Sequence, residues 1–274
     1  MRVAILCPSP FSETSCAMAV RLAELGYVPA GAVTLPSWDL STLVRKVGQW
    51  GGREVLRYAW GKLISRSGGE TQLRNAYLQS LLKKRMGSFR SLREVAAYYG
   101  FPVVACHDHN APGSISQLKE WSPDLIVFTG GNILREQLLH VPRLGVINLH
   151  LGLLPEIPGM SSPEWSLLND VPVGVTVHYI DAGVDTGPIL RRCEFPAAAQ
   201  CSSLDDLRNR LIAFGIEQVG EVVVGLDRGT MSPQPQPELD GDNQYFVMHE
   251  WLKEQAARRL QRGRVAVQAV RAHG

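Results

Sequence analysis

The fold of this chain can be predicted outward from the stretch Val146-Ile147-Asn148-Leu149-His150-Leu151-Gly152-Leu153-Leu154-Pro155. Its apolar first part, from Val146 to Leu149, predicts a short buried strand. Asn148 and His150 are two residues apart, so both side chains are expected on one face at the carboxyl end of that strand. Sheets of parallel strands place their ligand sites at such ends. The stretch therefore predicts a strand and a polar site beside it.

Short apolar runs on both sides of this stretch predict further strands, and periodic runs between them predict helices. The expected strands are Val3–Cys7, Val28–Leu35, Val103–Cys106, Leu125–Phe128, Val173–Tyr179 and Ile189–Phe195, and the expected helices are Ser12–Leu25, Ile115–Glu120, Leu134–Leu139 and Ser203–Leu226. Strands that alternate with helices predict an α/β fold, here a Rossmann-like, mostly parallel sheet with helices on both faces.

The chain is predicted to form one main domain with an insertion and a tail. Residues 1–230 make up this catalytic domain, and residues 36–95 within it are too long for an ordinary connection and have helical periodicity. Residues 231–274 are predicted as a short C-terminal extension, which opens with a proline-rich segment and ends in a basic helix after Tyr245.

The composition is that of a soluble globular protein. Of the 274 residues 45% are hydrophobic and 20% are charged, and the formal charge of +2 is too small to indicate nucleic-acid binding by itself. The five cysteines form no Cys-x-x-Cys pair, and no apolar run is long enough for a signal peptide or a membrane span. These features predict a protein of the reducing cytoplasm.

The predicted insertion has a strong net positive charge. Between Arg45 and Arg93 there are 12 Lys or Arg and two acids, a net of +10, so the rest of the chain is −8. Such a run can be a solvated charged face. It can also bind an anionic acceptor, a membrane surface or an RNA backbone. Binding to any of these three would weaken as the salt concentration rises.

A second polar stretch is Asp181-Ala182-Gly183-Val184-Asp185-Thr186-Gly187-Pro188-Ile189. Asp185 lies in its glycine-rich part, where the backbone can approach a ligand closely. An amide and an imidazolium can donate to a developing oxyanion, and a neutral imidazole can take a proton from an amine. Asp185 beside His150 would raise the pKa of the imidazole and fix its tautomer. Asp-x-Gly-x-Asp by itself is also a common loop composition and a weak calcium-like pattern.

Together the two stretches resemble the folate-dependent formyltransferase family, most strongly over residues 125–190. Members of this family have an Asn-x-His before a Leu-Leu-Pro loop and a later Asp-Thr-Gly, which supply a catalytic Asn, His and Asp. The matching residues here are Asn148, His150 and Asp185. In addition, Thr129-Gly130-Gly131-Asn132-Ile133-Leu134 is similar to the family's glycine-rich turn.

The resemblance implies 10-formyltetrahydrofolate as the formyl donor, an amine as the acceptor and no metal. Asn148 and His150 would hold the oxyanion, and Asp185 would orient His150 or a water that carries the proton away. His150 can instead be the base that takes the amine proton. The pterin ring is expected against the glycine-rich turn and the Asp181 loop, so the expected donor-binding residues are Gly131, Asn132, Ile133, Leu134, Ile180 and Asp181.

The acceptor is expected to be a small, anionic amine. The chain has Gly152 where many relatives have Ser, and Pro158-Gly159 where they often have Arg-Gly. Members that act on methionyl-tRNA carry a longer C-terminal domain, which favours the sugar N-formyltransferases, a nucleotide-linked amino sugar as acceptor and a homodimer. The alternatives are methionyl-tRNA, a lipid-linked sugar or another amine, formyltetrahydrofolate hydrolysis, and a non-catalytic folate-binding or nucleotide-binding module.

Two other polar groups receive simpler interpretations. Cys106-His107-Asp108-His109-Asn110 offers residue types that ligate metals, but it has no partner cluster elsewhere and is interpreted as a surface loop near the folate pocket. His178 and Tyr179 alternate in a predicted strand and are interpreted as one core and one surface position.

Overall fold

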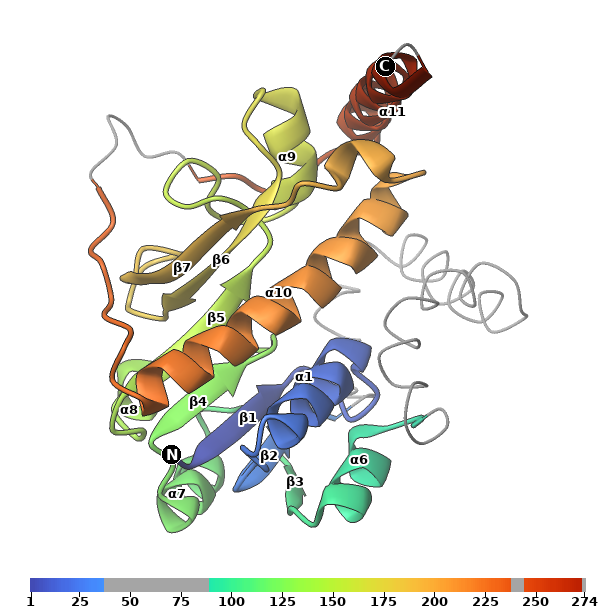
Figure 1. Cartoon of the computed structure of the whole chain (residues 1–274). Coiled ribbons are helices and arrows are strands. Elements are labelled where there is room, and N and C mark those ends of the chain that lie inside the picture. Colours follow the sequence, from blue (N-terminus) through green and yellow to red (C-terminus); the bar gives the residue numbers. More distant parts are fainter. Residues whose placement is uncertain (37–88, 238–243, 273–274) are drawn as a thin grey trace, which may run out of the picture.

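A computed structural model describes residues 1–36, 89–237 and 244–272, with side chains in the last helix described as far as Gly263 (Figure 1). Residues 37–88 of the predicted insertion, with most of its charges, lie outside the described residues. The described elements alternate between strands and helices over much of the chain. In chain order they are β1 (Val3–Cys7), α1 (Glu13–Glu24), β2 (Gly31–Thr34), α6 (Leu92–Tyr99), β3 (Val103–Ala105), α7 (Pro112–Trp121), β4 (Leu125–Phe128), α8 (Glu136–Leu139), β5 (Gly145–His150), α9 (Ser162–Leu168), β6 (Gly174–Tyr179), β7 (Ile189–Glu194), the short 3-10 helix η1 (Ala198–Gln200), α10 (Leu204–Asp227) and α11 (Glu250–Ala272).

In the described part of the chain, the strands form one sheet in the order β3-β2-β1-β4-β5-β6-β7 (Figure 1). Strands β1 to β5 pair in parallel, whereas β6 runs antiparallel to β5 and β7 antiparallel to β6. This arrangement confirms the predicted Rossmann-like, mostly parallel sheet. The antiparallel edge brings β6 beside β5, the strand that ends in His150.

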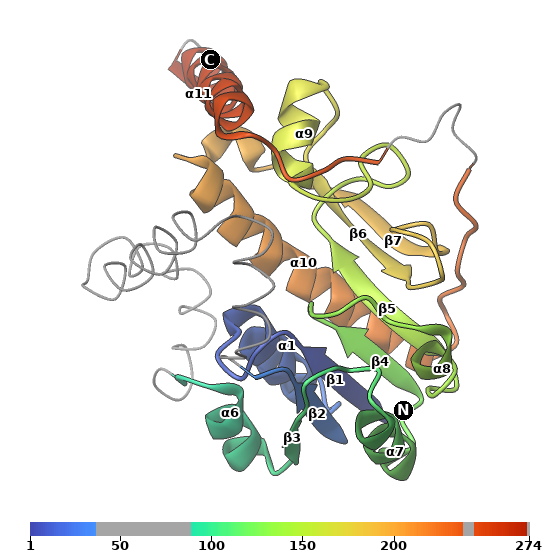
Figure 2. The same cartoon turned by 180° about the vertical axis from the view of Figure 1, so that it is seen from behind.

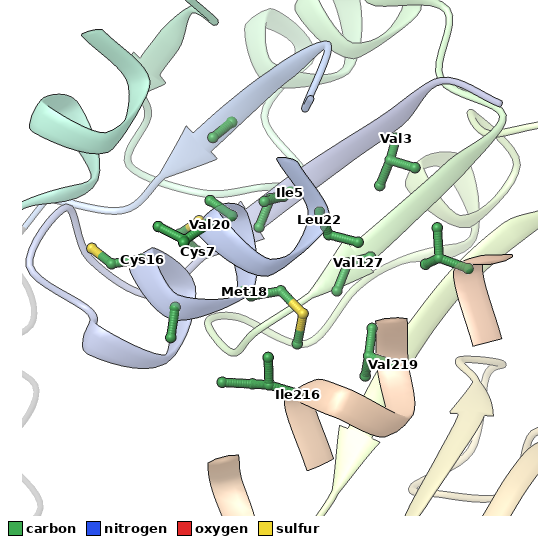
Figure 3. Close-up of a cluster of buried hydrophobic side chains, with 14 of the residues drawn as sticks. Val3, Ile5, Cys7, Cys16, Met18, Val20, Leu22, Val127, Ile216 and Val219 are labelled. Atoms are coloured by element: carbon green, nitrogen blue, oxygen red, sulfur yellow. The ribbon is translucent and has the colours of Figure 1, made fainter. Parts of the chain in front are cut away.

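Helices cover both faces of the sheet, as the alternation of strands and helices predicts (Figures 1 and 2). Successive side chains of β1 point to opposite faces of the sheet. All five residues of β1 are buried, so both faces are covered there. Ile5 points into the core shared with α1, α6 and α10, while Leu6 points into the core shared with α7 and α8. Figure 3 shows the first core, in which Met18 of α1 and Ile216 of α10 pack together.

The long helix α10 supports the strand that carries the site. Ser203 caps its first turn, because the Ser203 hydroxyl accepts a hydrogen bond from the Asp206 N–H, as the sequence predicts. A Cβ on Gly215 would lie 2.6 Å from the Leu149 side chain. The absence of a side chain at Gly215 therefore lets α10 approach β5 closely.

Two predicted elements begin two or more residues later than expected. The strand expected over Val28–Leu35 begins only at Gly31, because Val28 lies 45% exposed in the connection from α1. The helix expected over Leu134–Leu139 begins only at Glu136. Here the Asn110 side chain donates to the Ile133 carbonyl and accepts from the Arg135 N–H, which holds the preceding turn out of the helix.

The segments after α10 return to the edge of the sheet near β7 and to the loop before α9. Gln234 exchanges two backbone hydrogen bonds with Ile189 at the start of β7, of 2.7 and 2.8 Å. Tyr245 donates to the Pro158 carbonyl and accepts from the Met160 N–H. Both contacts lie next to loops that the sequence assigns to the site. None of the described helices is long and apolar enough to cross a bilayer.

Candidate functional site

Asn148 and His150 lie at the carboxyl end of β5, and the loop between β6 and β7 carries Asp185 to them. The Oδ2 atom of Asp185 is 3.3 Å from Nδ1 of His150. The Oδ1 atom of Asp185 is 3.5 Å from Nε2 of His178, and this same nitrogen is 3.2 Å from Nδ2 of Asn148. The three residues predicted from the sequence therefore meet, with His178 as a fourth member between Asn148 and Asp185.

His150 is buried, and both of its ring nitrogens face protein atoms. Its Nε2 lies 2.7 Å from the Ile157 carbonyl oxygen, which can only accept, so Nε2 carries a proton. A Cβ on Gly152 would lie 2.8 Å from this nitrogen and 2.9 Å from the Ile157 oxygen. Gly152, where many relatives have Ser, thus leaves room for this hydrogen bond.

Two opposing effects set the protonation of His150. Asp185 does raise the pKa of the imidazole, but burial lowers it more, so the pKa of His150 falls below its ordinary value of 6.5. The expected effect of Asp185 is thus present but outweighed, because the ring is only 6% exposed, which the sequence does not reveal. His150 is neutral at neutral pH.

Asp185 is held as a carboxylate in an unusual backbone conformation. Its φ is +57°, a left-handed value that Asp tolerates better than most residues. The Gly159 N–H donates to Oδ2 at 2.8 Å. Burial by itself would raise the pKa of Asp185, but the hydrogen bond with His178, the neighbouring His150 ring and the Gly159 N–H outweigh burial and lower it. Asp185 is therefore ionised at neutral pH.

Side-chain hydrogen bonds hold the loop around Asp185 on both sides. The Asp181 carboxylate accepts from the Gly183 N–H at 3.1 Å and from the Thr186 hydroxyl at 2.6 Å. Nε2 of Gln236 donates to the carbonyl oxygens of Asp185 and Gly187, at 2.7 and 2.8 Å. The C-terminal segment thus fixes the backbone that presents the Asp185 carboxylate.

Gln236→Ala is expected to lower kcat by about fivefold to tenfold, since two backbone hydrogen bonds that hold Asp185 are lost. The matched control is Gln234→Ala, because Gln234 contacts Ile189 through its backbone and its side chain is exposed. Steady-state kinetics of both variants check the prediction. Equal kcat values for the two variants would contradict a role of the Gln236 amide.

A pocket of about 780 Å³ opens beside this cluster, at the carboxyl ends of β1 to β4. The strand register places Asn148 opposite Phe128, the last residue of β4, just before the turn that lines the pocket. The volume lies within the range of small-molecule sites. The lining residues are Pro8, Leu35, Pro36, His107, Asp108, Asn110, Gly131, Asn132, Ile133 and Arg135. His107, Asp108 and Asn110 of the Cys106–Asn110 loop lie in the wall of this pocket, and the expected position of the loop near a folate site stays a prediction.

The pocket wall depends on Gly131 and on a buried histidine behind it. His109 is fully buried, and its Nε2 lies 3.2 Å from the Cys7 carbonyl oxygen. Gly131 has a φ of +142°, and a Cβ there would lie 2.4 Å from Cε1 of His109. Among the described residues, Oδ1 of Asn132 is buried and has no hydrogen-bond partner. The turn therefore has no room for a side chain at Gly131 and has an unused acceptor buried within it.

Gly131→Ala is expected to raise the KM of the pocket's ligand by about tenfold or more, because the new methyl group must displace His109 or the turn. The acceptor KM should change little. Gly113→Ala is the matched control, since a Cβ there meets nothing within 4 Å. Initial rates with each substrate varied in turn measure the effect. Equal changes in both KM values would contradict a one-sided role of this turn.

The donor-binding residues predicted from the sequence occupy different positions. Gly131, Asn132 and Ile133 line the pocket. Leu134 does not, because it is 7% exposed and belongs to the core under α7 and α8. Ile180 packs against the same core, and the Asp181 carboxylate is used within its own loop. Donor binding by these residues stays a prediction.

His178 and Gln236 are the residues that sequence reasoning missed. His178 was interpreted as an ordinary strand position, yet it is 2% exposed and contacts two of the predicted site residues. The position of His178 next to Tyr179 gives no signal of function in the sequence. The antiparallel register of β5 and β6 places His178 opposite Asn148, and that register is not visible in a local pattern. Gln236 lies in the proline-rich segment and has no local pattern at all.

Among the described residues, no cluster of three or more His, Cys, Asp or Glu side chains is arranged to hold a metal ion. Within the sequence Cys106-His107-Asp108-His109-Asn110, two of the side chains make contacts with other protein atoms. His109 is buried against Cys7, and the Asp108 carboxylate accepts from the backbone and side chain of Asn110.

The comparison with known proteins agrees with this geometry. Residues 95–223, which contain Asn148, His150, His178 and Asp185, match the formyl transferase family. This part of the chain is similar to the folate-dependent formyltransferases. The methionyl-tRNA formyltransferase of Pelobacter propionicus is 33% identical to it over 147 residues, which are 53% of this chain and 46% of that protein. The chain thus matches about half the length of this curated relative.

Solved structures of formyltransferases share the fold. Glycinamide ribonucleotide transformylase 1 from Symbiobacterium toebii superimposes with a TM-score of 0.56 at 18% identity, over 86% of this chain and 95% of that one. A sugar N-formyltransferase from Shewanella sp FDAARGOS_354 gives a TM-score of 0.53 at 14% identity, over 95% of this chain and 88% of that one. At these identities the likeness concerns the fold.

Proposed function

We propose that this protein moves a formyl group from 10-formyltetrahydrofolate to the primary amine of a nucleotide-linked amino sugar. The observation that carries the reaction is the meeting of Asn148, His150 and Asp185 at the carboxyl end of β5, within the part of the chain that matches the family. The overall change forms a bond between the amine nitrogen and the formyl carbon and breaks the bond to the donor nitrogen N10.

The contact between His150 and Asp185 supports proton uptake during this reaction. The Nε2 proton of neutral His150 is directed at Ile157, so a lone pair on Nδ1 faces the ionised Oδ2 of Asp185 at 3.3 Å. A proton placed between these atoms changes a repulsive contact into a charge-assisted hydrogen bond. The pair is therefore suited to take the proton of the attacking amine and to return it to N10 as the leaving group departs.

Asn148 supports stabilisation of the oxyanion. It is half-buried at the end of β5, whereas both ring nitrogens of His150 face protein atoms. Nδ2 of Asn148 has two hydrogens, and only one is needed for the contact with His178. The other can donate to the oxygen of the formyl group as negative charge develops there. This arrangement favours Asn148 over His150 as the oxyanion donor.

The pocket beside Asn148 suits the donor. A pterin ring is flat and carries N–H groups, and the Asn132 side chain in the pocket wall has an unpaired amide oxygen that a small rotation would turn to such a group. The backbone at Gly131 allows a ring to lie close to the turn. Gly131, Asn132 and Ile133 would hold the donor, which supplies the formyl group when it is bound.

The acceptor is proposed from residues in which this chain departs from the family pattern. Gly152 and Pro158 flank the loop that contacts His150 and Asp185, and Pro158 stands where many relatives have an arginine. The fold shared with the Shewanella sugar N-formyltransferase supports an amino sugar. Methionyl-tRNA is the second candidate, favoured by the identity to a methionyl-tRNA formyltransferase.

A substrate screen tests both parts of the proposal. The protein is incubated with 10-formyltetrahydrofolate and thymidine-, uridine- or guanosine-linked amino sugars, or with methionyl-tRNA, and a formyl gain is detected by mass. We expect formylation of an amino sugar. Formylation of methionyl-tRNA alone would overturn the acceptor, and tetrahydrofolate release without any amine would show a hydrolase. Donor binding without turnover of any acceptor would indicate a binding module.

A further inference from the structure

His178 lies directly opposite Asn148 in the antiparallel pair formed by β5 and β6. Opposite residues of such a pair project to the same face of the sheet and can touch. His178 is 2% exposed, and it is flanked by Asn148 on one strand and by Asp185 in the loop that follows its own strand. A polar ring this deeply buried needs partners for its nitrogens.

The partners of His178 fix its tautomer. Its Nδ1 lies 2.8 Å from the carbonyl oxygen of Tyr179, which can only accept, so Nδ1 carries a proton. Nε2 is left to face Asn148 and Asp185, at 3.2 and 3.5 Å. The backbone of Tyr179 thus holds the ring with one chosen nitrogen turned toward the site.

The orientation of the Asn148 amide follows from this nitrogen. When Nε2 has a lone pair, it accepts a hydrogen bond from Nδ2 of Asn148, and the amide is held with its nitrogen inward. One N–H of Asn148 then remains for another acceptor. When Nε2 is protonated, it donates to Oδ1 of Asp185, whose other oxygen faces His150. His178 thus holds the Asn148 amide in one protonation state and the Asp185 carboxylate in the other.

We propose that His178 is a positioning residue: with a lone pair on Nε2 it orients the Asn148 amide for the oxyanion, and with a proton on Nε2 it donates to the second oxygen of Asp185. This inference rests on the proposed formyl transfer. His178 acts through its neighbours, so its loss should lower kcat while the KM values of both substrates change little. A misplaced donor or base can cost about 100-fold in rate, and we expect a loss of about 10- to 100-fold here.

Two isosteric substitutions separate the two nitrogens of His178. In His178→Asn, the side-chain amide nitrogen lies where Nδ1 of the histidine was. This variant therefore keeps a donor for the Tyr179 carbonyl but loses the contacts of Nε2. The terminal amide of Gln takes the place of Nε2, so His178→Gln keeps a polar partner for Asn148 and Asp185. We expect a large kcat loss in His178→Asn and a loss of only about threefold in His178→Gln.

Tyr179→Phe serves as a control, because the Tyr179 backbone carbonyl that holds His178 is kept. Wild-type kcat is expected for it. A merely structural histidine would give equal losses in His178→Asn and His178→Gln, with matching losses of thermal stability, and that result would overturn the proposal. Near-normal kcat in His178→Asn would overturn it as well.

The pH dependence gives a second readout. The hydrogen bond with His178 helps to lower the pKa of Asp185, so this pKa should be higher in His178→Asn. Because the carboxylate must be ionised, activity should then be lost at a higher pH as the solution is acidified. An acid limb of kcat/KM in the same place as in wild type would contradict contact with Asp185.

A third readout needs no turnover and separates this inference from the proposed function. Burial lowers the pKa of His150 most and the neighbouring His178 lowers it further, so the pKa of His150 should rise in His178→Asn. Titration of the His150 ring by NMR, with no substrate present, measures this shift. An unchanged titration would overturn the placement of His178, whereas a shift in a protein without formyl transfer would overturn only the proposed function.

Discussion

Asp185→Asn is expected to lower kcat by about 100- to 10,000-fold, the range that a lost acid–base group usually costs. Asn has the same size as Asp and tolerates the left-handed backbone at φ +57°. Its amide oxygen can still accept the hydrogen bond from the Gly159 N–H. The substitution therefore removes the charge that faces His150 and keeps the loop.

Single-turnover and steady-state kinetics measure the effect, and donor binding by fluorescence or calorimetry should be near normal. Asp205→Asn makes the same chemical change at an exposed position in the first turn of α10 and should leave kcat unchanged. A near-normal kcat of Asp185→Asn at saturating donor would show that proton uptake does not depend on this carboxylate.

His150→Gln is expected to cause a loss of similar size. The terminal amide of Gln can replace Nε2 and keep the hydrogen bond to the Ile157 carbonyl, so the loop after β5 keeps its anchor. It has no counterpart of Nδ1, the atom that faces Asp185. Because a buried His→Ala change would also leave a cavity, the Gln variant separates the lost proton acceptor from lost packing.

The double variant His150→Gln/Asp185→Asn tests whether the two residues act as one unit. If a single proton is shared between Nδ1 and Oδ2, the second substitution should add little to the first. If the kcat loss of the double variant equals the product of the two single losses, the proton is not shared. Thermal unfolding of all three variants shows whether any of them has lost its fold.

The sheet was predictable because its signals are local. Val3 to Cys7 and Leu125 to Phe128 are apolar throughout, and their strands have the predicted bounds. The cap at Ser203 marks the start of α10. Errors arose where a contact from a distant segment set an end, as where the Asn110 side chain holds the turn before α8.

The candidate site was predictable only in part. Asn148 and His150 share a strand end, so the two-residue period of a strand puts them together. Their meeting with Asp185 was inferred from a resemblance, and its distance is a matter of tertiary structure. His178 lies 30 residues from Asn148, and Gln236 lies 51 residues from Asp185, so no local pattern connects either pair.

The sequence by itself determined the alternation of strands and helices, the family resemblance and the residue types that carry the chemistry, because each of these follows from short-range patterns. Only the tertiary structure decided which nitrogen of each histidine faces Asp185 and that His150 is neutral. The physical reason is that proton positions depend on burial and on hydrogen-bond partners. Those partners, Ile157, Tyr179 and Gly159, act through backbone atoms that carry no signature in the sequence.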